Sequence, residues 1–152
     1  MKHKILIIDT TKTVYKTLCE FLGDDYLLFY APDGLDGIAK AKDGLPDVIL
    51  LAEDVPKLNG YETIKLMKAD PAIAHIPVIF ITTTHDVKTE IDGMLLGAVD
   101  CLIKPCNPVL AKIRIDLHLR EEEQKKTLTD RTDKLHFPVR HTVSQLLIIS
   151  IM

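Results

Sequence analysis

The sequence predicts an α/β fold in which helices surround a parallel sheet. Short runs of branched apolar residues recur along the chain, and segments with helical spacing of apolar residues lie between them. Parallel neighbouring strands need such crossover helices, so this alternation is typical of βαβ units. Five strand and helix pairs can be read in the 152 residues, a length that suits one domain plus an appendage.

The first three units follow one another without long loops. Strands are expected at 4–9, 26–30 and 48–51, and helices at 13–22, 34–42 and 60–69. Asp33 and Asn59 are expected to cap the second and third helices, because short polar side chains accept hydrogen bonds from the first free backbone N–H groups. Val14, Leu18 and Phe21 recur at helical spacing and are expected to face the core.

The last two units place strands at 78–83 and 101–103 and a helix at 87–96. Three apolar residues of that helix are expected to point inward: Ile91, Met94 and Leu95. Gly97 follows it, where a left-handed C-cap favours a residue without a side chain. The fifth helix is expected to begin at Pro108 after an Asn107 cap, since proline suits the first helical position.

Composition narrows the classes of partner. A formal net charge of −3 gives no basic face for nucleic acid or anionic lipid, so we expect protein partners, no nucleic acid and no membrane. The three cysteines have no CxxC spacing, which predicts neither a disulfide framework nor a zinc site. No run approaches a membrane span and the N-terminus lacks a signal-peptide core, so a cytoplasmic location is expected.

Four loops carry the side chains that could do chemistry. They follow the first, third, fourth and fifth strands: Asp9–Thr10, Ala52–Pro56, Thr82–Thr83 and Lys104–Pro105. In a parallel sheet these carboxyl ends meet at one edge, which is where open α/β sheets bind ligands. We call these four loops together the mouth.

Several segments resemble the receiver domain of bacterial response regulators, the CheY-like superfamily. They are "KILIID", "PDVILL", "DVPKLNGYE", "DPAIAHIPVIFITT" and "GAVDCLIKP", and the resemblance covers residues 2–119 without a gap. It implies a flavodoxin-like, doubly wound (βα)5 sandwich of strand order 2-1-3-4-5. It also implies two-component phosphorelay signalling, in which the family moves a phosphoryl group from a histidine kinase to an aspartate with the help of Mg²⁺.

Three positions depart from what the resemblance implies. The phosphoacceptor aspartate of the family falls on Ala52, which has no oxygen to attack phosphorus. The acidic pair falls on Asp9 and Thr10, so one of two metal-oriented carboxylates is missing. The aromatic that reports phosphorylation falls on Cys101. We therefore expect a degenerate pseudo-receiver with no catalytic residue, no cofactor, and Mg²⁺ bound weakly if at all.

Two positions keep the residue types that the resemblance implies. The hydroxyl falls on Thr82, and the lysine falls on Lys104, which precedes Pro105 in a bond that is commonly cis in the family. With two carboxylates gone, Asp9 and Lys104 balance one to one, and our hypothesis is that they pair directly without metal. The pair would hold strands one and five in one arrangement.

Nearby acids could replace the missing acceptor. Side chains alternate along a strand, so Glu53 is expected to point away from the mouth, while Asp54 shares the parity of Ala52. Asp54 is then the one credible substitute, against the interpretation that both are solvated loop acids. His118 on the fifth helix is expected to be a surface side chain.

The chain is expected to divide into three parts. Residues 1–119 form the receiver domain, residues 120–136 a charged helical connector, and residues 137–152 an apolar tail. Pro138 is expected to stop the helix. Leucines near heptad spacing on the fifth helix and connector make a homodimer possible and weakly specified: Leu110, Leu117, Leu128 and Leu135. The tail either docks on this domain or a twin, or begins an output domain.

The preferred interpretation is a receiver domain of a response regulator or hybrid sensor that contacts a sensor kinase or output domain without accepting phosphate. One alternative is an active receiver phosphorylated on a non-standard acid such as Asp54. A second is a constitutive dimerisation or spacer domain in a larger sensor.

Overall fold

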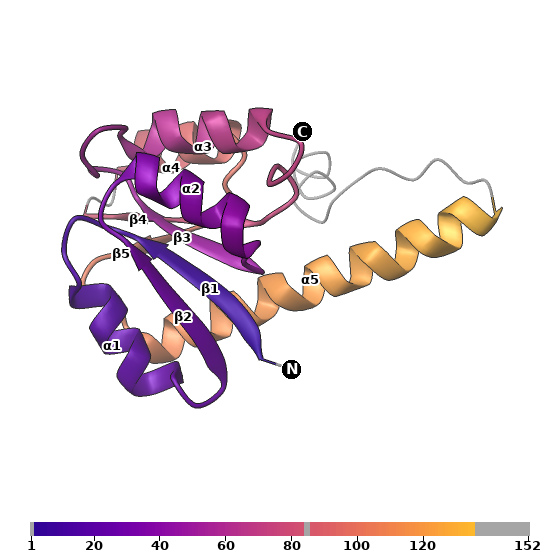
Figure 1. Cartoon of the computed structure of the whole chain (residues 1–152), viewed down its shortest axis with the longest axis horizontal. Coiled ribbons are helices and arrows are strands. Elements are labelled where there is room, and N and C mark those ends of the chain that lie inside the picture. The colour runs from indigo at the N-terminus through magenta and orange to yellow at the C-terminus, as the bar shows by residue number, and fades with distance from the viewer. Residues whose placement is uncertain (1, 84–85, 136–152) are drawn as a thin grey trace.

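The computed structural model describes residues 2–83 and 86–135, with backbone alone for 126–135 (Figure 1). The strands are β1 (His3–Ile8), β2 (Tyr26–Ala31), β3 (Val48–Ala52), β4 (Val78–Thr82) and β5 (Asp100–Ile103). The helices are α1 (Thr13–Leu22), α2 (Gly34–Gly44), α3 (Gly60–Ala69), α4 (Val87–Leu95) and α5 (Pro108–Leu135). All pairings are parallel, in the order β2-β1-β3-β4-β5. The predicted fold class and strand order are confirmed.

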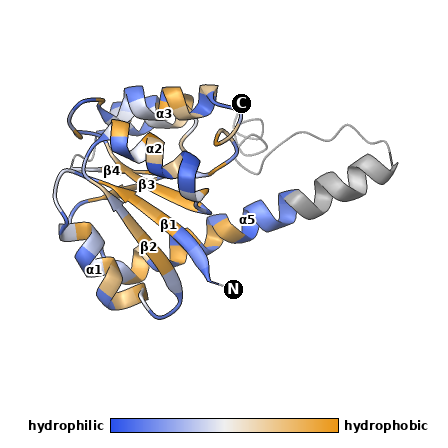
Figure 2. Cartoon of the chain, viewed as in Figure 1, coloured by the Kyte–Doolittle hydropathy of each residue, from blue (hydrophilic) through white to orange (hydrophobic). Residues whose placement is uncertain are grey.

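Helices cover both faces of the sheet, with α2, α3 and α4 on one side and α1 and α5 on the other (Figure 1). Alternation along β1 feeds both cores: Leu6 and Ile8 pack into one, Ile5 and Ile7 into the other. The strands β3 and β4 are buried along their whole length, as continuous apolar runs require when both faces are covered. In Figure 2 both strands are orange, the colour of hydrophobic residues.

The expected caps are present. Asp33 accepts a hydrogen bond from the Asp36 backbone N–H at 2.8 Å, and Asn59 accepts one from Glu62 at 2.9 Å. The Asn107 side chain accepts from the second residue of α5, Val109, at 2.9 Å. Gly97 has a φ of 113°, as expected for a residue that ends a helix with a left-handed turn. Local sequence signals therefore set where these helices begin and end.

The expected inward face of α4 is wrong. Ile91, Met94 and Leu95 are 51%, 41% and 80% exposed. The buried residue of this helix is Gly93, where an added Cβ would come within 2.8 Å of the Phe80 ring. The helix therefore approaches β4 through a glycine, and this contact turns its larger apolar side chains outward.

The inward face of α1 needs a smaller correction. Val14 and Leu18 are buried as expected, but Phe21 is 46% exposed and Leu22 is buried in its place. The stripe follows a spacing of four residues, which keeps Val14, Leu18 and Leu22 in one line along the helix.

The fifth helix begins at Pro108 and continues unbroken to Leu135, projecting from the sheet (Figure 1). This is the expected helical extension. The apolar tail, residues 137–152, lies outside the described residues. Within residues 2–83 and 86–135, no helix is long and apolar enough to cross a membrane.

Candidate functional site

The mouth brings Asp9 and Lys104 together. Asp9 follows β1 and is 1% exposed, while Lys104 follows β5. The Lys104 ammonium lies 2.8 Å from Asp9 Oδ2, so the expected ion pair is present. This contact is not aligned as a hydrogen bond, and Oδ2 has no hydrogen-bond partner among the described residues. The bond from Lys104 to Pro105 is cis.

The residue at the centre of the mouth is Ala52, the last residue of β3. Its methyl group is completely buried and it pairs in register with Ile81 of β4. A buried methyl group offers no oxygen to a metal ion or to phosphorus. The side chain at this strand end is therefore chemically inert.

The hydroxyl of Thr82 is hydrogen-bonded to the carboxylate of Glu53. Thr82 is 1% exposed, and its Oγ1 donates a hydrogen bond of 2.6 Å to Glu53 Oε1. The other oxygen of Glu53 accepts from the Tyr61 hydroxyl at 3.0 Å. Burial, together with this bond, raises the pKa of the Tyr61 phenol, so it stays protonated and donates. The carboxylate thus bridges the end of β4 and α3.

The expected direction of Glu53 is wrong for a physical reason. Strand alternation predicts direction only while the chain stays extended, and β3 ends at Ala52. Beyond that point the turn brings Glu53 over the end of β4, where it meets Thr82. No periodic signal in the sequence marks this contact.

The remaining loop residues lie at the surface. Asp54 is exposed, and its backbone carbonyl accepts a long contact of 3.5 Å from the exposed Thr10 hydroxyl. Thr10 therefore lies beside the loop after β3 and joins it through the main chain. The structure brings Asp9, Lys104, Thr82 and Glu53 into the mouth and leaves the Asp54 side chain toward solvent.

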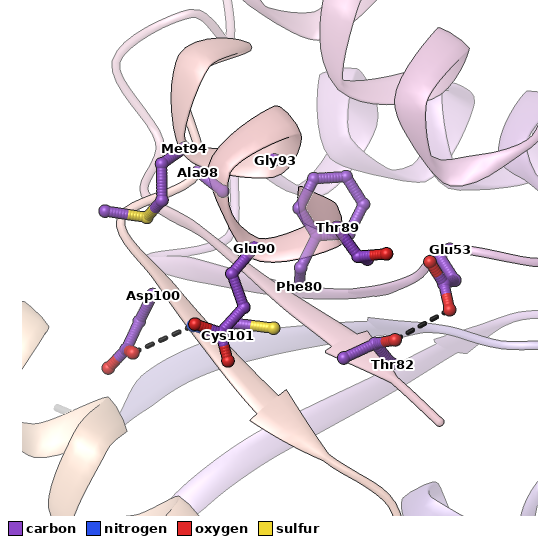
Figure 3. A pocket seen from close by; sticks show the side chains of 10 residues that line it. All are labelled: Glu53, Phe80, Thr82, Thr89, Glu90, Gly93, Met94, Ala98, Asp100 and Cys101. Carbon is purple, nitrogen blue, oxygen red and sulfur yellow. Dashed lines mark hydrogen bonds between the residues drawn. The ribbon is translucent and has the colours of Figure 1, made fainter. Parts of the chain in front are cut away.

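Cys101 borders a small cavity under α4 (Figure 3). The cavity has a volume of about 10 Å³, room for about one water molecule. Glu53 and Thr82 lie at one end of it, and Met94 and Asp100 lie at the other. Burial raises the pKa of the Cys101 thiol to about 11, so the group is protonated and neutral at pH 7. Cys101 is a small, partly buried, unreactive residue.

A second charged cluster joins β5 to α5. Asp100 accepts two 2.8 Å hydrogen bonds from Arg114, one to each oxygen, and His118 Nε2 lies 3.0 Å from its Oδ2. His118 Nδ1 lies 3.3 Å from Glu121. His118 is 6% exposed, so the expected surface position is wrong. The four-residue spacing of Arg114 and His118, which puts both on one helix face, was the signal available in the sequence.

This cluster sets two pKa values. Burial disfavours the charged form of His118, but the hydrogen bonds and negative charges of Asp100 and Glu121 together outweigh it and raise the pKa of the imidazole. Burial also works against the Asp100 carboxylate, yet the bonds from His118 and Arg114 hold its pKa below the usual range. Each group keeps the other charged.

Residues 5–116 match the response regulator receiver domain family. The chain belongs to this family. Among relatives, protein PilH of Pseudomonas aeruginosa is 34% identical over 103 residues, which cover 67% of this chain and 85% of PilH. Response regulator PleD of Caulobacter vibrioides is 33% identical over 116 residues, 76% of this chain. This protein is thus a receiver domain of the two-component response regulator type.

Other relatives are much longer than this receiver. A probable cyclic di-GMP phosphodiesterase of Vibrio cholerae is 32% identical over 142 residues, which cover 93% of this chain and 32% of that protein. The match with PleD covers 26% of PleD. The chain therefore spans about a third or less of the length of these two relatives, and the names of the whole proteins describe more than the part that is shared.

Solved receiver structures have the same architecture. A putative response regulator from Chloroflexus aurantiacus is 28% identical, with a TM-score of 0.74 over 79% of this chain and 99% of that one. Chemotaxis response regulator CheY4 of Vibrio cholerae is 26% identical, with a TM-score of 0.69 over 75% of this chain and 98% of that one. The fold is thus that of a complete receiver domain.

Proposed function

We propose that this receiver works as a phosphorylation-independent protein-interaction module of a cytoplasmic two-component system, contacting a sensor kinase or an output domain. The observation that carries the proposal is Ala52. The position where the family resemblance implies the acceptor carboxylate holds a completely buried methyl group. Phosphoryl transfer to a side chain needs a nucleophilic oxygen in that place.

The rest of the mouth supports the proposal because its cation and its hydroxyl already have acidic partners. Lys104 faces Asp9 at 2.8 Å, and Thr82 donates to Glu53 at 2.6 Å. In a competent site these two groups would be open to the oxygens of an incoming phosphoryl group. In this chain an arriving anion would first have to displace two carboxylates.

The residues of the mouth do not fit Mg²⁺. This ion requires near-octahedral coordination by oxygen and is usually held by one or two carboxylates plus phosphate oxygens. Asp9 supplies one carboxylate, and a lysine ammonium lies 2.8 Å from its buried oxygen. Among the described residues, no group of three or more His, Cys, Asp or Glu side chains is arranged to hold a metal. We include independence of Mg²⁺ in the proposal.

The test is a phosphodonor assay on the whole chain. The protein is incubated with acetyl phosphate and Mg²⁺ and its intact mass is measured, with a receiver that has the acceptor aspartate as the positive control. We expect no added phosphoryl mass. An acid-stable, base-labile adduct would overturn the proposal, and its loss in Asp54→Asn would assign it to Asp54, whose side chain is exposed.

An apolar stripe on α5 supports a second candidate, a constitutive dimeric spacer. Four apolar residues of this helix are between 43% and 56% exposed: Val109, Leu110, Ile113 and Leu117. They recur at helical spacing, as helices that pair through one face do. Sedimentation that depends on protein concentration in the native chain, and becomes monomeric in Leu117→Glu, would support this function. A native monomer contradicts it.

A further inference from the structure

An open groove of about 670 Å³ runs between α4 and the part of α5 near Lys125. Its apolar wall consists of the α4 residues Ile91, Met94 and Leu95, and Pro77 and Val99 extend it. The three α4 side chains are 41% to 80% exposed. Contiguous apolar surface of this kind on a globular domain marks a place where something binds.

The groove is a permanent feature of the fold. α4 packs on Phe80 through Gly93, where an added Cβ would approach the ring to 2.8 Å. Because that close contact fixes the rotation of the helix, Ile91 and Leu95 cannot turn inward without separating helix and sheet. The apolar wall must therefore face outward, and it is stabilised by being covered.

The sequence contains a segment that needs such a cover. Residues 143–152, "VSQLLIISIM", include seven apolar residues and no charged one. A segment that is apolar, rich in branched residues and uncharged is prone to aggregation when it is left in water. It therefore has the composition of a buried segment, and its apolar side chains match the wall of the groove.

The chain is long enough to return to the groove. From Lys125, which lines the groove, to Leu135, where α5 ends, the helix rises about 15 Å at about 1.5 Å per residue. Residues 136–142 can span about 23 Å when extended, at about 3.3 Å each. Pro138 favours a break from the helix at this point. Residue 143 can thus reach the level of Lys125 with length to spare.

Charge agrees with this path. The groove is bordered by three glutamates and two lysines, and the ammonium of Lys68 already donates to the carbonyl groups of Ala74 and Ile76 at 3.0 and 2.9 Å. Residues 136–142 contain Arg140 and no acidic residue. Glu122 is paired with Lys125 at 3.0 Å and Glu121 with His118 at 3.3 Å, so the border has a small excess of negative charge, which a connecting segment without acidic residues does not oppose.

We propose that residues 143–152 dock in the groove between α4 and α5 of the same chain. The docked segment covers Ile91, Met94 and Leu95 and occupies a surface that a protein partner would otherwise contact. Residues 143–152 then act as an intramolecular competitor for that surface. This role is independent of whether the mouth accepts phosphate.

Hydroxyl-radical oxidation of methionines in the 152-residue chain tests whether the groove is covered. Met94 lines the groove, and the buried Met67, 1% exposed, serves as the internal reference. We expect Met94 to be oxidised several-fold faster in Ile149→Asp than in the native chain, with Met67 unchanged, because the altered segment no longer covers the groove. Equal rates for Met94 in both chains would overturn the proposal.

Amide hydrogen exchange of residues 143–152 tests the segment side. Two isoleucines of nearly equal exposure provide a matched pair: Ile91 lines the groove at 51%, while Ile113 on α5 lies outside it at 56%. We expect the native segment to be protected, Ile91→Asp to lose that protection and Ile113→Asp to keep it. Circular dichroism checks that both variants keep the fold.

Three exchange results would overturn the proposal. They are an unprotected native segment, protection that survives Ile91→Asp, and protection that rises with protein concentration together with the sedimentation coefficient. The last result would place the segment on a second copy of the chain. None of these readouts depends on a phosphodonor, so this proposal and the proposed function can fail separately.

Discussion

Asp9 and Asp100 are both mostly buried carboxylates that face a cation, but the chain surrounds them in different ways. Asp100 receives two hydrogen bonds from Arg114, a contact from His118 and a 2.8 Å bond from the Cys101 backbone N–H. Asp9 Oδ2 has the Lys104 ammonium at 2.8 Å and no aligned hydrogen bond among the described residues.

This difference separates a carboxylate whose hydrogen bonds the chain itself supplies from one whose Oδ2 has an ion pair and no aligned hydrogen bond. Buried polar groups in native proteins are almost always hydrogen-bonded, and each exception calls for an explanation. The cluster around Asp100 is complete within the chain and fixes α5 against β5. In our proposal the mouth keeps the place of a binding site, with the buried methyl group of Ala52 where the family resemblance implies the acceptor carboxylate.

Placing a carboxylate at the centre of the mouth should give the largest change. Ala52→Asp inserts a charge at a completely buried position that lies in the same mouth as Asp9 and Glu53. Burying an unpaired charge next to like charges is strongly unfavourable, so we expect a loss of about 3 kcal/mol in the free energy of unfolding. Urea denaturation measures it, with Ala52→Asn as the control for added volume.

Adding Mg²⁺ to the same denaturation experiment tests whether the new carboxylate creates a metal site. A second carboxylate beside Asp9 would complete a better oxygen donor set, so Mg²⁺ should return part of the stability lost in Ala52→Asp. The same ion should leave Ala52→Asn and the native chain unchanged. Equal stabilisation of all three proteins by Mg²⁺ would show that the native mouth already binds the ion.

Removing the charge of Asp100 should give the second-largest loss in the free energy of unfolding. Asp100→Asn leaves Arg114 and His118 facing a neutral amide, and His118 is 6% exposed. Losing a charged hydrogen-bond partner in a mostly buried cluster costs about 2 kcal/mol, discounted because the Arg114 side chain is 41% exposed. Urea denaturation at pH 7 gives the value. An unchanged midpoint would remove the contrast with Asp9.

Titration of His118 should give a smaller effect. The pKa of His118 is raised in the folded protein, so protonation stabilises the fold fully below the ordinary histidine pKa of about 6.5. That contribution is lost as the pH rises through the higher folded value. The free energy of unfolding should therefore fall as the pH rises above about 6.5 and through the folded pKa, and urea denaturation at a series of pH values measures the decrease.

Variants separate His118 from the other histidines. His118→Gln should flatten this pH dependence and cost about 1 kcal/mol at pH 6, through the lost charge-assisted bond to Asp100. His75→Gln, which changes an exposed histidine, should leave the slope as it is in the native chain. A slope that survives in His118→Gln would place the titrating group elsewhere.

The sequence predicts those parts of the molecule whose causes are local or follow from the order of the strands. The Asp33 and Asn59 caps follow from short-range hydrogen bonding, and the Asp9–Lys104 pair follows from strand order plus a one-to-one count of charges. In each case the deciding information lies within a few residues or in the topology. The order of the strands was thus enough to predict the ion pair between Asp9 and Lys104, which lie on different strand ends of the mouth.

The wrong predictions have causes that are far away in sequence. The outward face of α4 depends on how closely Gly93 approaches Phe80 of another element. Glu53 lies one residue beyond a strand, where alternation no longer determines direction, and Thr82, its partner, is 29 residues away. His118 is buried because Asp100, 18 residues earlier, is there to bind it. Helical and strand periodicities contain no information about these three contacts between distant segments.

The smallest effect should come from the same substitution at the other carboxylate. Asp9→Asn leaves Lys104 without its partner, but the Lys104 side chain is 24% exposed and its ammonium can turn to water. The change also removes the desolvation cost of a buried charge whose Oδ2 has no aligned hydrogen bond. We therefore expect less than about 1 kcal/mol of change in either direction by urea denaturation. A loss as large as that of Asp100→Asn would mean that the two carboxylates are equal structural anchors, and that the mouth stabilises the fold as strongly as the cluster on α5 does.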